Sequence, residues 1–147
     1  MDVHQLLAED RTVIVQDAWR SVVMLKHYQR DGKEATLQRV ETLFDHVARA
    51  IRMRDLCELL DYAERIAKQR FDANFELSEV QTAFFMLEEA IWRRVLARIP
   101  PAGLAEALGL VGTAITRGKD AFARAYISLA NQSRAPSIDL SDLFKGT

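Results

Sequence analysis

The sequence is poor in the residues that crosslink or interrupt a chain. A single cysteine, Cys57, stands among 147 residues, which excludes a framework of internal disulfide bonds and favours a reducing compartment. Its immediate neighbours in a helical pattern are acidic, so we expect a buried and unreactive thiol. Three prolines and six glycines are few, and this scarcity favours long uninterrupted helices.

Charge excess and long apolar runs are also missing. Lys and Arg together number 20 against 21 Asp and Glu, so the chain lacks the basic excess that is typical of nucleic-acid binders. The longest uncharged run, residues 107–116, is about half of the ~20 residues that a membrane span requires. The N-terminal segment has neither the basic nor the apolar region of a signal peptide. We therefore expect a cytoplasmic protein with no nucleic-acid partner and no membrane partner.

What is present is apolar spacing of helical period along nearly the whole chain. It predicts five main helices, over residues 10–30, 36–53, 55–72, 78–99 and 102–131. Gly32 suits the end of the first helix, while Asp55 and Ser78 suit the starts of the third and fourth. Pro100 and Pro101 separate the last two.

These elements predict an all-α fold, a single-domain helical bundle with globin-like or bundle packing and a long C-terminal helix. We expect an all-helical domain over residues 1–131 and a polar C-terminal tail over residues 132–147. The tail ends in an apolar-acidic pattern that includes Leu140 and Phe144. It is expected either to dock on its own domain or to bind a partner as a short helix, with these two residues as contacts.

The helix over residues 78–99 carries apolar side chains on two faces rather than one. One row consists of Val80, Phe84, Leu87 and Ile91, and a second row consists of Phe85, Trp92, Leu96 and Ile99. A helix that is apolar over so wide an arc must be covered from two sides, either by its own domain or by a partner. Phe85 and Trp92 are therefore candidate interface residues.

The last predicted helix contains Gly109, Gly112 and Gly118. A glycine inside a helix costs about 1 kcal/mol relative to alanine, so three of them require a reason. Close approach of another helix is the usual one, and it makes Gly109 and Gly112 candidate interface residues. The alternative is a kink or break near residues 116–118.

No arrangement of residues in the sequence suggests a reaction. His4, His27 and His46 lie on different segments, and none has the HExxH spacing of a zinc site. A phosphate-binding glycine loop and a GxSxG nucleophile motif are also absent from the sequence. We therefore expect no enzyme, no catalytic or metal-binding residue and no cofactor. His27 could still ligate a haem or respond to pH, although a half-buried helix histidine is the plainer interpretation.

Several segments together resemble a known family. They are an early helix with Trp19 and Tyr28, the stretch LLDYAERIAKQRFD (residues 59–72), the stretch FELSEVQTAFFMLEEAIWRRVL (residues 75–96) and the long last helix. Over residues 6–129 the chain resembles the N-terminal helical domain of RsbR/RsbD-type RsbT co-antagonists. The resemblance implies an all-α sensory or regulatory module that precedes an output domain and passes a signal through its last helix. Because no output domain follows here, we expect a free-standing sensor or adaptor.

Two functions remain open at this point. The first is a non-enzymatic regulatory or sensory signalling module that acts through protein–protein interaction and homodimerisation, with a partner in a signalling pathway. The alternative is a globin-like sensor that binds haem or another small ligand through His27 and the aromatic interior. The family resemblance gives no warrant for a cofactor.

Overall fold

The computed structural model describes residues 1–134, and every regular element in that range is a helix. The helices are α1 (Val3–Glu9), α2 (Arg11–Val22), α3 (Lys26–Asp31), α4 (Lys33–Met53), α5 (Cys57–Asp72), α6 (Leu77–Arg98) and α7 (Pro101–Arg134). The prediction of an all-α, single-domain bundle with a long C-terminal helix is confirmed.

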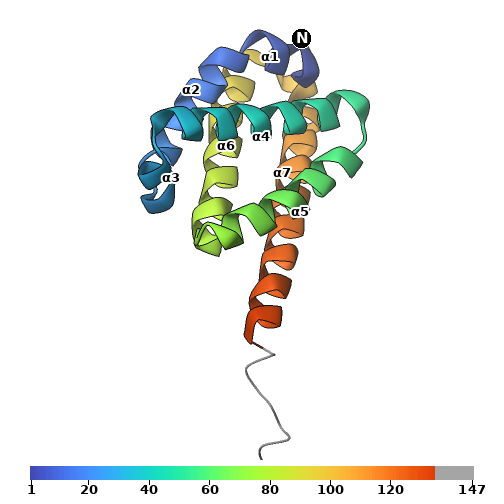
Figure 1. The fold of residues 1–147 in the computed structure, drawn as a ribbon. Coiled ribbons are helices and arrows are strands. Elements are labelled where there is room, and N and C mark those ends of the chain that lie inside the picture. The colour runs from blue at the N-terminus through green and yellow to red at the C-terminus, as the bar shows by residue number, and fades with distance from the viewer. Residues whose placement is uncertain (135–147) are drawn as a thin grey trace, which may run out of the picture.

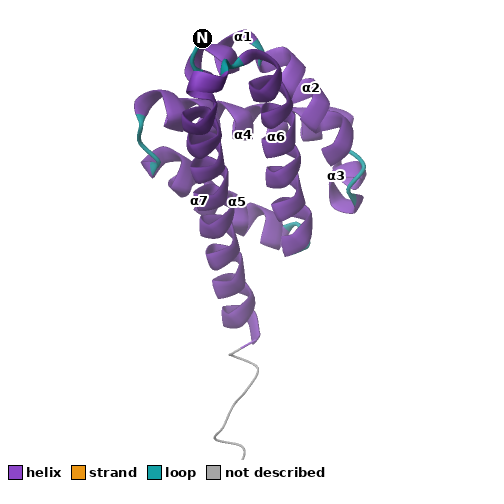
Figure 2. Ribbon diagram, turned by 180° about the vertical axis from the view of Figure 1, so that it is seen from behind, coloured by secondary structure: helices purple, strands orange, loops and turns teal. Residues whose placement is uncertain are grey.

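Two long helices form the frame of the domain. In Figure 1, α6 and α7 run side by side, and α4 and α5 cross in front of them, while α1 to α3 close the end and side next to α6. The view from behind in Figure 2 shows that α4 and α5 do not cover the opposite side of the α6–α7 pair. Phe84, Phe122, Ile91 and Ile115 are fully buried and fill the interior between these layers.

An ion-pair cluster fixes the N-terminal helices to α6. Asp10, at the junction of α1 and α2, is buried and accepts hydrogen bonds from Arg94 and Arg98. Arg98 also pairs with Glu9 at 2.9 Å. Because Asp10 lies more than 80 positions from both arginines in the sequence, these bonds close the fold over a long chain separation.

The prediction of one continuous helix over residues 10–30 is wrong, because the structure divides this segment into α2 and α3. Leu25 has extended backbone angles (φ −71°, ψ 140°) and precedes α3 as its N-cap. The turn redirects α3 so that Tyr28 is buried and the backbone N–H of His27 donates to Glu79 of α6 at 2.8 Å. α1 is an additional short helix that the apolar spacing did not predict.

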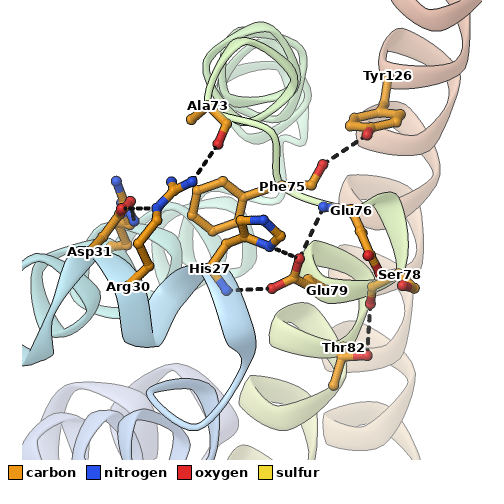
Figure 3. Close-up of polar contacts among 11 residues, drawn as sticks. His27, Arg30, Asp31, Ala73, Phe75, Glu76, Ser78, Glu79, Thr82 and Tyr126 are labelled. Atoms are coloured by element: carbon orange, nitrogen blue, oxygen red, sulfur yellow. Dashed lines mark hydrogen bonds and ion pairs between the residues drawn. The ribbon is translucent and has the colours of Figure 1, made fainter.

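The predicted cap of α6 is wrong by two residues. The helix begins at Leu77 with Glu76 as its N-cap, whereas Ser78 lies inside the first turn. Glu76 and Glu79 form a capping box, in which each side chain binds the other residue's backbone N–H. Figure 3 shows this turn, where the Tyr126 hydroxyl also donates to the Phe75 carbonyl at 2.8 Å and so joins α7 to the α5–α6 connection.

α7 runs without a break past residues 116–118, so the alternative of a kink there is wrong. Close packing within the fold accounts for Gly118 alone, since a Cβ at that position would lie 3.2 Å from Phe84 Cε1. A Cβ at Gly109 or Gly112 would have nothing within 4 Å. The helix reaches Arg134, three residues beyond the predicted end at residue 131.

The prediction of a buried thiol at Cys57 is wrong, because this residue is exposed. It begins α5, where its backbone N–H donates to Asp55 Oδ1 at 2.9 Å. The neighbouring Asp55 carboxylate raises the pKa of the Cys57 thiol, which lowers the thiolate fraction and agrees with an unreactive cysteine.

Candidate functional site

The outer row of α6, defined as Phe85, Trp92 and Leu96, is an apolar surface that the described helices leave open. These side chains are 45%, 37% and 63% exposed, and their i, i+7, i+11 spacing puts them on one helix face. Ile99, the last member of the predicted second row, is buried. α6 is therefore covered on two sides, by α2 and by α7, but three of its apolar residues still face outward.

The other predicted interface residues are not brought together with the outer row. Gly109 of α7 lines a mostly apolar hollow of about 440 Å³ whose wall also includes Leu56 and Leu110. This hollow lies against the end of α4 and the start of α5, and its lining contains no residue of α6. Gly112 is half-buried on α7. Leu140 and Phe144 lie outside the described residues.

His27 and Glu79 form a polar contact at the junction of α3 and α6 (Figure 3). The Glu79 carboxylate is almost fully buried and accepts hydrogen bonds from the backbone N–H of His27 and of Glu76, at 2.8 and 3.1 Å, besides contacting His27 Nδ1. Burial alone raises the pKa of Glu79, but these hydrogen bonds outweigh it and leave the pKa lowered. His27 is thus the half-buried helix histidine of the plainer interpretation.

One small void lies next to Tyr28, the residue that follows this histidine in the chain. The void that Tyr28 and Phe84 line has a volume of about 20 Å³, and His27 is not among its lining residues. A space of this size holds about one water molecule and is far too small for a porphyrin.

Phe75, in the α5–α6 connection, is the centre of a cluster that the sequence analysis missed. The guanidinium carbons of Arg30, Arg39 and Arg70 lie 5.5, 5.3 and 5.5 Å from its ring centroid. We call these four residues the arginine corner. A guanidinium over an aromatic face is stabilised by about 0.5–2 kcal/mol, depending on its desolvation.

The arginine corner carries more positive than negative charge. Asp31 pairs with Arg30 and with Arg39, each at 2.8 Å. Both hydrogen bonds lower the pKa of Asp31, and the bond from Arg30 has the larger effect. Arg70 is only 6% exposed, and its Nε has no hydrogen-bond partner among the described residues. A buried guanidinium without a paired carboxylate is costly, so Arg70 requires an explanation.

Two buried tyrosines lie beside Arg70. Burial raises the pKa of Tyr62 to about 12 and also raises the pKa of Tyr28, with the Arg70 charge opposing both shifts. Both phenols therefore stay protonated near neutral pH and cannot supply a counter-charge. Sequence spacing could have revealed Arg70, because it continues the buried row of Leu59, Ala63 and Ile66 at helical intervals.

Neither a metal-binding cluster nor a membrane-spanning segment is found in the described helices. In the part of the chain covered by α1 to α7, no group of three or more His, Cys, Asp or Glu side chains could hold a metal ion. None of those helices is long and apolar enough to cross a membrane. Burial raises the pKa of Glu88 on α6, and Lys119 of α7 opposes the shift.

The fold defines the class as a small all-helical domain. Residues 12–135 match the family described as the RsbT co-antagonist protein RsbRD N-terminal domain, and the chain belongs to that family. The family resemblance drawn from the sequence is thereby confirmed, and the match covers nearly all of α2 to α7. No curated protein and no solved structure matches the chain.

Proposed function

We propose that this domain is a non-enzymatic sensory or regulatory module that works in the cytoplasm by binding proteins, and that it homodimerises through the outer row of α6. The observation that carries the proposal is the exposure of Phe85, Trp92 and Leu96 on one face of a helix whose other faces are packed. Large apolar side chains gathered on an open helix face are typical of interaction surfaces.

The geometry of the outer row suits a symmetric contact. A two-fold axis crossing α6 would set each row against its copy, so that one patch serves both subunits. Trp92 and Phe85 would be the buried anchors, since aromatic residues dominate interface energetics. Glu89 lies between Phe85 and Trp92 on the same stripe, and its ion pair with Arg93 at 2.6 Å would place a neutralised polar contact within the interface.

The family description supplies the setting for a second contact. It names RsbT, so we propose that the protein partner belongs to RsbT signalling. Gly109 and Gly112, where an added Cβ meets no neighbour, and the apolar tail residues Leu140 and Phe144 are the proposed docking positions.

The dimer is tested by light scattering coupled to size-exclusion chromatography over a range of protein concentrations. We expect the wild-type chain to dimerise. The double variant Phe85→Ser/Leu96→Ser should raise the dissociation constant of the dimer at least about tenfold, which corresponds to a loss of about 1.4 kcal/mol of association energy. The matched control is Met24→Ser/Met53→Ser, which removes two other exposed apolar side chains (70% and 58%) outside α6 and should leave the dimer intact.

Thermal unfolding of both variants checks that neither change damages the fold. A wild-type chain that stays monomeric at every concentration would contradict the proposal. Equal dissociation of the two double variants would also contradict it, because the outer row would then have no special role.

A further inference from the structure

A pocket of about 450 Å³ lies between α4 and α5, and its lining contains no residue of α6. Its size falls within the range of about 300–1,000 Å³ that is usual for small-molecule sites. The wall is formed by one face of each helix, with His46 stacked on Tyr62 at a ring-centroid distance of 4.2 Å. Both helices are long and packed on the frame, so the walls are fixed in position.

The charges in the lining all have one sign. Arg39, Arg65 and Arg70 line the pocket, and no aspartate or glutamate does. The remaining lining residues include two amide donors, Gln38 and Gln69, and Thr42, whose hydroxyl already donates to the Gln38 carbonyl at 2.8 Å. A wider and more open hollow next to it shares Arg65 and also contains Lys68, but four acidic residues line it: Glu58, Asp61, Glu64 and Asp72. The lining without carboxylates is therefore that of the narrower pocket.

Arg70 is the independent indication that something is bound there. Its side chain is more than nine-tenths buried at the base of the pocket, and its Nε has no partner within residues 1–134. The phenol of Tyr62 next to it stays protonated near neutral pH and can donate a hydrogen bond, but it cannot neutralise a guanidinium. The pocket thus presents three guanidinium groups and no lining carboxylate, and among residues 1–134 only Arg39 has an ion-pair partner, Asp31 at 2.8 Å.

We propose that this pocket binds a small molecule with an oxyanion group, a phosphate ester or a carboxylate, held by the guanidinium groups of Arg39, Arg65 and Arg70. Planar guanidinium groups match the paired oxygens of both anions and bind them through two parallel hydrogen bonds. The buried position of Arg70 strengthens such bonds by excluding water. This binding site does not depend on the outer row or on dimerisation.

Titration calorimetry of the full chain tests the site with two probes, inorganic phosphate and citrate, against sodium chloride at matched ionic strength. We expect saturable binding of one probe per chain and a rise in the thermal midpoint, because a ligand that binds only the folded state stabilises it. Saturation by phosphate alone would assign a phosphate ester, and saturation by citrate alone would assign a carboxylate. If neither probe saturates the protein up to about 10 mM, any Kd is weaker than that concentration and the binding energy is marginal. That result would overturn the proposal.

Two variants locate the binding. Arg70→Met replaces the buried charge with an apolar side chain of similar length, and Arg65→Gln changes an exposed residue whose loss should not affect folding. Each should weaken binding of the probe about tenfold or more, as expected for a lost charged hydrogen bond. The matched control, Arg124→Gln on the exposed face of α7, makes the same charge change outside the pocket and should leave affinity unchanged.

If Arg70→Met fails to fold, Arg65→Gln and the His46 ring signals decide the question. We expect the probe to shift the His46 ring resonances in the wild-type chain and to shift them less in Arg65→Gln. Equal affinity of Arg65→Gln and Arg124→Gln, with unmoved His46 signals, would show that the anion only screens surface charge and would overturn the proposal.

Discussion

The α6–α7 interior and the arginine corner both contain buried side chains, but they are built from opposite kinds of residue. Phe84, Ile91 and Ile115 fill the interior with apolar side chains alone. The corner surrounds one aromatic ring, Phe75, with guanidinium groups, and one of them is buried without a carboxylate. The first arrangement stabilises the fold, whereas the second presents buried charge that a bound anion would compensate.

The physical reason for the difference is the free energy of desolvation. Burial of apolar surface contributes roughly 25 cal/mol per Å², so the interior of the α6–α7 pair is favourable wherever it packs closely. A charge taken out of water carries a penalty of several kcal/mol unless partners replace the lost solvation. We therefore expect substitutions in the interior to change stability most, and substitutions in the corner to change stability less and ligand response more.

The largest effect is expected from truncating the interior face of α6. Leu87→Ala or Ile91→Ala should lower the free energy of unfolding by about 2–5 kcal/mol, because both side chains are fully buried and would leave cavities. Chemical denaturation measures this loss. Phe85→Ala, on the exposed face of the same helix, should cost less than about 1 kcal/mol. Similar costs at Phe85 and Ile91 would show that the two faces of α6 are not as described.

A smaller effect is expected at the polar contact beside the corner. Glu79→Gln should cost about 1–3 kcal/mol, since an amide cannot accept from every donor that the carboxylate satisfies. The loss should depend on pH with a definite sign. Because the pKa of Glu79 is lowered in the fold, its contribution is complete above the unfolded value of about 4.3 and disappears as pH falls through the folded value.

Denaturation of wild-type and Glu79→Gln chains at several pH values measures this dependence. Their difference in unfolding free energy should shrink from about pH 5 toward pH 3. Glu64→Gln, at an exposed site on α5, is the control and should show no such change. A difference that stays constant over this range would contradict the role assigned to Glu79.

The smallest effects are expected along α7. Gly109→Ala and Gly112→Ala should raise stability by up to about 1 kcal/mol, because alanine favours the helix and its Cβ meets no neighbour. Gly118→Ala should gain less or lose stability, since Phe84 Cε1 would lie 3.2 Å from the new Cβ. Thermal unfolding compares the three variants. A gain at Gly118 as large as the gain at Gly109 would contradict the close packing of α7 on α6 there.

Local patterns in the sequence were sufficient for the helical class and for most helix positions. The apolar spacing of residues 36–53 predicted α4 to within three residues, because one buried stripe on a straight helix leaves a clear period. The break between α2 and α3 was missed, since residues 23–25 contain neither glycine nor proline. It is stabilised by the bond from His27 to Glu79, which are 52 positions apart.

The candidate sites were predicted only in part for similar reasons. Helix spacing showed that α6 has two apolar rows, but which row the domain covers depends on how other helices pack. Arg70 was missed because a charged residue is expected at the surface, although it occupies a buried position of its helix. Phe75 is only five positions from Arg70, but Arg30 and Arg39 come from the distant helices α3 and α4, so the arginine corner exists only in the folded chain.

Native-state hydrogen exchange, measured with and without phosphate or citrate at constant ionic strength, tests the contrast between the two regions most directly. We predict the highest protection for backbone amides of α6 and α7 in the interior, independent of the anion. We predict lower protection for amides of α4 and α5 around Arg70, rising selectively when the anion is added. Uniform protection of both regions, or an anion effect spread evenly over the whole chain, would contradict this account.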